Sequence, residues 1–246
     1  MSRNRRPVQT RRATAPGATK TKQRAPRARP RPKRTVTFIC GIAKGGTGKT
    51  MLALHLAWVA QLRGWRVLFV DTDSQGDGFR RLGGDDENRE PFRWAPGCEA
   101  YASPTTYDVE AIANDFDLII IDTPPHLGLP PGKPQADLVL LPIDGFDAAF
   151  DARETIADLP EGAEGWIVLN KTGLAGKRHA RILDQLEQQC PPGVAISALR
   201  VPLGGDIARV DWTRKPAWDD GHGGKAGIAL RKWCDLVLDW SVEKLY

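Results

Sequence analysis

The sequence predicts a single α/β domain with a mostly parallel, doubly wound sheet and helices on both faces. Five short apolar runs, at 35–41, 66–71, 117–122, 137–143 and 165–170, have the continuous character of strands buried on both faces. Helical patterns separate most of these runs, and such alternation is typical of a parallel sheet. A length of 246 residues suits one such domain with a terminal extension.

The first elements can be placed in order along the chain. The strand at 35–41 leads through a glycine-rich loop into a helix at about 49–63, and Gly64 is placed to end that helix as a C′ residue. The strand at 66–71 follows. We expect residues 74–97 to be irregular, because they are polar and rich in glycine, aspartate and arginine.

The second half of the chain continues the alternation. A short strand is expected near 98–102 and a helix at 105–114. Further helices are predicted at 146–158 and 176–189, and a last one at about 226–244.

The last helix has an apolar stripe at helical spacing, formed by Leu230, Trp233, Val237 and Trp240. Its opposite face carries acidic residues, whereas helices that bind membranes favour Lys and Arg on that face. We therefore expect the stripe to pack on the core, and attachment to a membrane is the alternative.

The loop after the first strand has the composition of a phosphate-binding loop. It reads Ala43-Lys44-Gly45-Gly46-Thr47-Gly48-Lys49-Thr50. Its glycines allow the backbone N–H groups to approach a phosphate chain at the N-terminus of the following helix. Lys49 is placed to reach the β- and γ-phosphates, and the Thr50 hydroxyl is placed to bind Mg²⁺.

Polar residues follow three other strands of the predicted sheet. They include Asp73, Asp122 and Asn170. Ligands of open α/β sheets bind beyond the carboxyl ends of the strands, so these side chains and Lys44 are expected to share one nucleotide site.

These motifs resemble, in matching order from about residue 35 to 220, those of the ParA/MinD family of deviant Walker A ATPases. The loop with its second lysine, Lys44, carries the resemblance most strongly. The segments Asp71–Gly76 and Asp122–Pro125 resemble the family's second motif and its Walker B strand with the start of switch II. Asn170 resembles an adenine-contacting asparagine, and Val201-Pro202 resembles the element that closes over the base.

The resemblance implies binding of ATP and Mg²⁺ and assigns residues to each role. Nucleotide contacts fall on Lys44, Gly45, Gly46, Thr47, Gly48, Lys49, Thr50, Met51, Asn170 and Pro202. Metal binding falls on Thr50, Asp73 and Asp122, and catalysis on Lys44, Asp73 and Lys49. Asp73 is expected to orient the attacking water, and Asp71 to bind or support the metal.

In this family the lysine that matches Lys44 reaches the phosphates of the partner in a dimer that sandwiches two ATP molecules. The resemblance therefore implies a homodimer on ATP binding, slow hydrolysis alone and acceleration by a partner. Two departures bear on hydrolysis, because Asp77 stands where asparagine is usual and switch II runs into a proline-rich segment at 129–134.

Residues 1–34 form a basic tail, with 13 Lys and Arg, five prolines and no acid, whereas residues 35–246 carry a net charge of −8. Too few apolar residues are present to form a core, so we expect this tail to be disordered. A flexible cationic arm suits a polyanion such as DNA. A solubilising extension and a targeting peptide are the alternatives.

The leading hypothesis is a cytoplasmic, nucleoid-associated ParA-like ATPase that binds DNA without sequence preference. A ParB-like or other cargo adaptor would trigger hydrolysis and release. Candidate DNA contacts are Arg27, Arg29, Arg31, Lys33, Arg34, Arg214, Lys215, Arg231 and Lys232. Two alternatives are a MinD-like ATPase that cycles on a membrane and a weakly hydrolysing accessory protein of conjugation or regulation.

Overall fold

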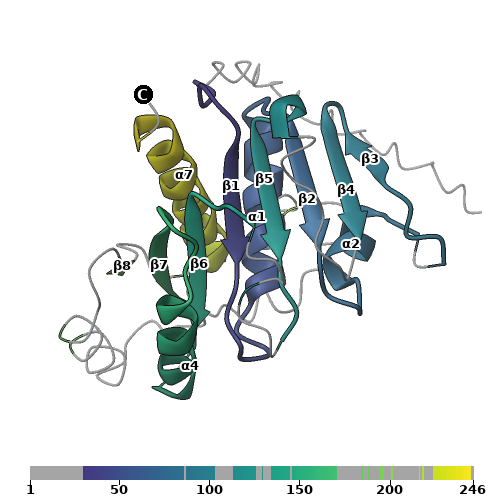
Figure 1. Cartoon of the computed structure of the whole chain (residues 1–246). Coiled ribbons are helices and arrows are strands. Elements are labelled where there is room, and N and C mark those ends of the chain that lie inside the picture. The colour runs from purple at the N-terminus through teal and green to yellow at the C-terminus, as the bar shows by residue number, and fades with distance from the viewer. Residues whose placement is uncertain are drawn as a thin grey trace, which may run out of the picture.

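A computed structural model describes residues 30–85, 87–102, 113–125, 129, 134–144, 146–170, 184, 188, 194–196, 201, 216, 218 and 224–244. These residues form one eight-stranded sheet of order β3-β4-β2-β5-β1-β6-β7-β8 (Figure 1). The strands are β1 Val36–Cys40, β2 Val67–Asp71, β3 Phe92–Ala95, β4 Cys98–Ala102, β5 Leu118–Asp122, β6 Leu138–Ile143, β7 Glu164–Leu169 and β8 Val194–Ile196. The helices are α1 Lys49–Leu62, α2 Asp77–Leu82, the short 3₁₀ helix η1 Ala113–Asp115, α4 Phe146–Ala157 and α7 Gly224–Lys244.

The sheet is doubly wound around its central strands. Among the strands of the described residues, only β3 is antiparallel to its neighbour, and the other pairs are parallel. From β1 the sheet extends to one side through β5 and β2, and to the other side through β6 and β7. The carboxyl ends of β1, β2 and β5 therefore meet at one edge, the lower edge in Figure 1.

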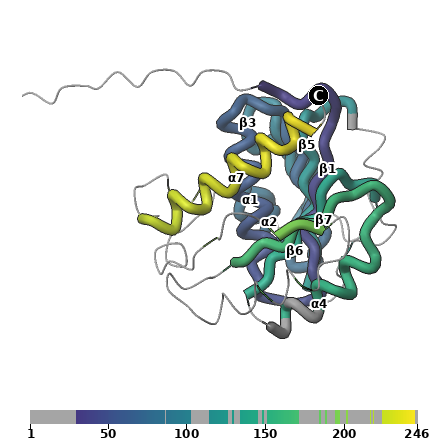
Figure 2. Tube along the Cα trace, turned by 90° about the vertical axis from the view of Figure 1, so that its left-hand side faces the viewer, coloured from purple at the N-terminus to yellow at the C-terminus, as the bar shows by residue number. Residues whose placement is uncertain are grey.

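Side chains alternate between two cores, one on each face of the sheet. Phe38 and Ile120 face a core shared with α1 and α7. Ile39 and Ile121 face a second core that includes residues of α4. The two layers of helices are seen on opposite sides of the strands in Figure 2, which confirms the predicted architecture.

The expectation of an irregular segment at 74–97 was wrong in two places, because α2 and β3 lie within it. Phe79 of α2 is 1 % exposed and packs edge-on against Phe92 of β3, with ring centroids 5.1 Å apart. The Phe79 N–H also donates to Asp71 Oδ2 at 2.9 Å. These tertiary contacts override the weak local preference of a glycine-rich segment.

Two further expectations concern parts of the chain that are barely described. The helix at 105–114 lies outside the described residues except for its last two, which belong to η1. Of the helix at 176–189, only residues 184 and 188 are described. Strand β8 was not predicted, since three half-buried or exposed residues give no period-two signal.

The apolar stripe of α7 packs on the core, as predicted. Leu230, Trp233 and Val237 have no exposed surface, and α7 lies along α1 (Figure 2). On the polar side, Arg63 at the end of α1 forms ion pairs with Asp235 and Asp239 at 2.6 and 2.7 Å. Across the described residues, no helix has the length and apolar character that would span a bilayer.

His55 of α1 is buried between two indole rings. Its ring lies 5.0 Å from that of Trp58 and 5.3 Å from that of Trp218, and Nδ1 lies 2.6 Å from the Met51 carbonyl oxygen. Burial lowers the pKa of His55 to about 4, the charge of Arg81 contributes to this shift, and the Met51 carbonyl opposes it.

Because its pKa is low in the folded state, His55 is expected to destabilise the folded protein in acid. Between pH 7 and pH 5 the unfolded chain binds a proton at His55 that the folded chain excludes, so the free energy of unfolding falls by about 2 kcal/mol. We expect a His55→Phe variant to lack this loss when urea unfolding is compared at the two pH values. Other titrating groups are common to both proteins, so they cancel in the difference. An equal pH dependence in variant and wild type would contradict the assignment.

Candidate nucleotide-binding site

The glycine-rich loop connects β1 to α1 in the geometry that phosphate binding requires. Gly46 and Gly48 have φ values of 74° and 99°, in the left-handed region that glycine adopts at little cost. Gly48 is the N-cap residue of α1, and no side chain caps that helix end. The N–H groups of its first turn are therefore placed to bind an anion, which the helix dipole also favours.

Lys49 is folded back onto the loop. Its Nζ donates to the carbonyl oxygens of Ile42 and Lys44, at 3.1 and 3.0 Å. Burial lowers the pKa of Lys49, while the charges of Asp122 and Asp73 oppose the shift. The ammonium thus lies at the loop before any phosphate arrives, held by backbone carbonyls that a phosphate can replace.

Asp71 and Asp122 are neighbours across β2 and β5, where the register pairs them directly. Both Asp122 carboxylate oxygens are buried, and neither accepts a hydrogen bond of normal geometry from the described residues. Burial and the nearby Asp71 charge raise the pKa of Asp122 well above its ordinary value, while contact with the Thr50 hydroxyl and the charge of Lys49 oppose the shift.

A buried carboxylate whose oxygens accept no hydrogen bond of normal geometry is a good partner for a cation. Among the described residues, no three His, Cys, Asp or Glu side chains form a metal-binding group by themselves. Mg²⁺ is usually held by one or two carboxylates together with substrate phosphates and water, so this donor set fits it. Thr50 and Asp122, with Asp73 on the neighbouring turn, are the residues of this chain that would hold the ion beside a bound nucleotide.

Asp71 shapes the segment that follows β2. Its two carboxylate oxygens accept the N–H groups of Asp73 and Phe79, at 3.0 and 2.9 Å. Burial raises the pKa of Asp71 to about 6, and these backbone donors oppose the shift. Asp73, which is half-buried, accepts the Gln75 N–H at 2.9 Å. Asp71 therefore supports the turn that presents Asp73. The roles expected for it, binding or supporting the metal, stay predictions.

Lys44 has an acidic neighbour that the sequence analysis missed. Its Nζ lies 3.9 Å from Asp144 Oδ1, and both side chains are partly exposed. Asp144 directly follows β6, so the rule that singled out polar residues at strand ends would also have found it. Lys44 is thus held at the rim of the loop within its own chain.

The remaining predicted site residues are distributed as follows. Asn170, at the end of β7, donates from Nδ2 to the Thr47 carbonyl oxygen at 2.6 Å. Met51 lies in the first turn of α1 and packs against the core. Pro202 lies outside the described residues. Asp77, which stands where asparagine is usual in the family, is exposed at the start of α2, and its carboxylate pairs with Arg80.

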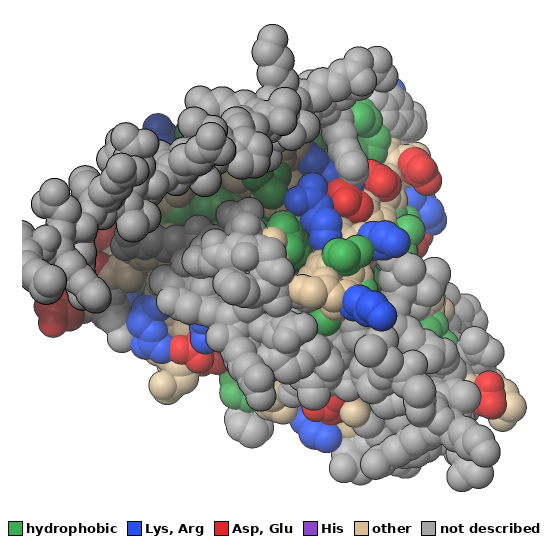
Figure 3. Space-filling view, turned by 180° about the vertical axis from the view of Figure 1, so that it is seen from behind, with side chains coloured by type: hydrophobic (Ala, Val, Ile, Leu, Met, Phe, Trp, Pro, Cys, Tyr) green, Lys and Arg blue, Asp and Glu red, His purple; other side chains and the backbone are tan. Residues whose placement is uncertain are grey.

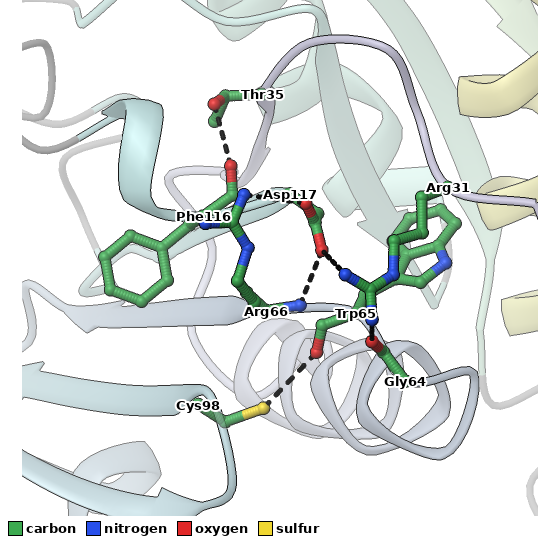
Figure 4. A network of polar contacts seen from close by, with 8 residues as sticks. All are labelled: Arg31, Thr35, Gly64, Trp65, Arg66, Cys98, Phe116 and Asp117. Carbon is green, nitrogen blue, oxygen red and sulfur yellow. Dashed lines mark hydrogen bonds and ion pairs between the residues drawn. The ribbon is translucent and has the colours of Figure 1, made fainter.

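Two arginines at the root of the tail contact the body of the domain. Arg31 lies 3.5 Å from Asp117 Oδ2 and donates to the Gly64 carbonyl oxygen (Figure 4). Arg34 pairs with Asp137. Since Asp117 and Asp137 precede β5 and β6, this root lies at the sheet edge opposite the phosphate loop.

The other candidate DNA contacts include two residues of α7 and four that lie outside the described residues. Arg231 pairs with Asp235 at 3.2 Å and lies over the Trp218 ring, whereas Lys232 is exposed. On the described part of the face seen from behind, basic and acidic side chains are interspersed (Figure 3). The residues outside the description are Arg27, Arg29, Arg214 and Lys215.

The fold and the loop together define a P-loop nucleotide-binding protein. A model of the CobQ/CobB/MinD/ParA nucleotide binding domain matches residues 38–213, which is most of the chain. The protein therefore belongs to this family, as the resemblance of its motifs implied.

Individual relatives agree with this assignment. The cell division protein PomZ of Myxococcus xanthus is 47% identical over 47 residues, which cover 19% of this chain but only 15% of PomZ. A variant of Cyanothece McdA in complex with ATP has a TM-score of 0.65 at 15% identity, over 83% of this chain and 96% of McdA. MinD of Pyrococcus horikoshii OT3, complexed with Mg-ADP, has a TM-score of 0.63 at 18% identity, over 85% of this chain and 98% of MinD.

Proposed function

We propose that the protein is a positioning ATPase that binds Mg-ATP, forms an ATP-dependent dimer and attaches to DNA in that state. The supporting observation is the juxtaposition of the uncapped α1 N-terminus, Lys49 and the buried Asp122 carboxylate at one sheet edge. This arrangement suits a triphosphate and its metal ion. ATP and Mg-ADP are the ligands of the similar McdA and MinD structures.

In this proposal the chemistry is positioning and charge stabilisation. When bound, Mg²⁺ would offset the charge that develops on the phosphates. Lys49 would contact the phosphates, and Asp73 would orient the attacking water on a turn held by Asp71. Lys44 lies at the loop rim, where an approaching second copy could receive it in place of Asp144.

Hydrolysis is proposed to end the DNA-bound state, with a ParB-like or other cargo adaptor as accelerator. The names of the similar proteins support a role in positioning, since PomZ is a cell division protein and MinD determines the septum site. Attachment of α7 to a membrane is disfavoured, because its apolar stripe is buried against α1.

DNA binding tests the proposal directly. Fluorescence anisotropy with a duplex of arbitrary sequence would compare ATP, ADP and no nucleotide at two salt concentrations. We expect tight binding only with ATP. Equal DNA binding under all three nucleotide conditions would mean that the tail alone attaches the protein to DNA. It would contradict the proposal that attachment depends on ATP.

The tail is proposed to supply much of the DNA affinity. Deleting residues 1–33 removes 12 of the 35 basic residues, so we expect DNA affinity to fall by on the order of tenfold or more and its salt dependence to weaken. ATP turnover should be unchanged, because the root of the tail lies at the edge opposite the phosphate loop. A tail of equal length with glutamine at every Lys and Arg separates charge from length. Unchanged affinity and salt slope in both variants would contradict the proposal.

A further inference from the structure

Asn170 is held firmly at the end of β7. Its own N–H donates to the Ile143 carbonyl oxygen at 2.8 Å, and the carbonyl of Leu169 accepts the Val201 N–H at 2.9 Å. Its side chain is almost completely buried. Backbone hydrogen bonds to both sides thus fix the point from which the carboxamide extends.

The carboxamide is directed at the phosphate loop. Nδ2 donates to the Thr47 carbonyl oxygen at 2.6 Å. A Cβ built on Gly48 would lie 2.2 Å from the same nitrogen, so the amide packs against the loop without a gap. Asn170 and the loop are 123 positions apart in the chain, and this contact joins β7 to the start of α1.

This hydrogen bond has a consequence for phosphate binding. The Thr47 carbonyl and the Gly48 N–H belong to one planar peptide unit, so fixing the direction of the carbonyl also fixes that of the N–H. Thr47 is flanked by two glycines with positive φ, and it is completely buried. A loop of this kind has no regular ladder to orient its peptides, and a buried carbonyl needs a donor.

We propose that Asn170 is a positioning residue of the phosphate loop: by holding the Thr47 carbonyl, it sets the direction of the Gly48 N–H and thereby the affinity for any triphosphate, whatever its base. This inference rests on the proposed binding of Mg-ATP. It differs from the adenine contact implied by the family resemblance, because a base contact acts on adenine alone. The same amide group can affect all nucleotides only through the loop.

Binding of three ligands distinguishes the two roles. Isothermal titration with Mg²⁺ would compare ATP, GTP and inorganic tripolyphosphate on the wild type, Asn170→Ala and Asn170→Asp. We expect affinity for all three to fall by a common factor, roughly ten- to a hundredfold, in both variants, since each lacks the buried donor. Asn88→Ala, which removes an exposed asparagine, is the matched control and should bind like the wild type.

A second measurement separates positioning from general loss of structure. In nucleotide-free Asn170→Ala, hydrogen exchange should rise in peptides that cover residues 43–50 and stay unchanged in α7. If Asn170→Ala lost affinity for ATP alone and still bound tripolyphosphate like the wild type, the positioning role would be overturned in favour of a contact with the base. A uniform rise in exchange would also overturn it. If the wild type binds none of the three ligands, the proposed function fails, and the assignment of Asn170 fails with it.

Discussion

Replacing Gly48 with alanine is expected to abolish measurable binding of Mg-ATP. The residue has φ 99°, where a side chain is strained, and the new Cβ would lie 2.2 Å from Asn170 Nδ2. Neither residue can move freely, because Gly48 is the N-cap of α1 and the Asn170 N–H is bonded to the Ile143 carbonyl oxygen of β6. The loop must therefore change shape, and the N–H groups that cradle the phosphates change direction with it.

Isothermal titration would measure this effect, with Gly162→Ala as the matched control. Gly162 has φ 80° but no atom within 4 Å of the added Cβ, so its substitution introduces backbone strain without a clash. The control should lose about 1 kcal/mol of stability and bind Mg-ATP normally. Near-normal affinity in Gly48→Ala would show that the loop does not bind phosphate in the observed conformation.

Replacing Arg63 with alanine is expected to have the largest effect on stability. The Arg63 side chain is 2% exposed and contacts Asp235, Asp239 and the Asp235 carbonyl oxygen, all on α7. Burial alone would raise the pKa of Asp235, but the hydrogen bond from Arg63 and the charge of Arg231 outweigh it and lower that pKa. Removing the guanidinium leaves this carboxylate half-buried with one partner fewer.

We expect a loss of about 3 kcal/mol in the free energy of unfolding, measured with urea, because the substitution removes a buried side chain and its three charge-assisted contacts with α7. The control is Arg93→Ala, since the Arg93–Glu99 pair is exposed and its loss should cost less than about 1 kcal/mol. A loss in Arg63→Ala no greater than in the control would mean that α7 is held by its apolar stripe alone.

Much of this fold could be predicted from the sequence, because its strands are continuous apolar runs with little competing pattern. The β1–loop–α1 unit was placed to within a residue or so, since Gly48-Lys49-Thr50 and Gly64 mark both ends of the helix. Strand β3 and helix α2 were missed because they depend on contacts such as Phe79 with Phe92, which local sequence does not reveal.

The edge of the sheet at which the candidate site lies could be predicted, but the contacts between its side chains could not. Asp122 was expected at this edge, and its register partner there is Asp71, because parallel strands share one carboxyl edge. Two contacts could not be anticipated, Lys44 with Asp144 and Asn170 with the Thr47 carbonyl, because each depends on the rotamer of a polar side chain that joins distant parts of the chain. The Asp77–Arg80 pair has the i, i+3 spacing of helix neighbours, but it was missed because α2 was not predicted.

In the proposed mechanism, ATP joins two copies of this protein through Lys44. Sedimentation velocity on the wild type and Lys44→Ala, with Mg-ATP, Mg-ADP and no nucleotide, would test this dimerisation. We expect a dimer only for the wild type with ATP, while Lys44→Ala stays monomeric yet still binds ATP through Lys49. A wild type that remains monomeric with saturating ATP, or a Lys44→Ala variant that dimerises equally well, would contradict it.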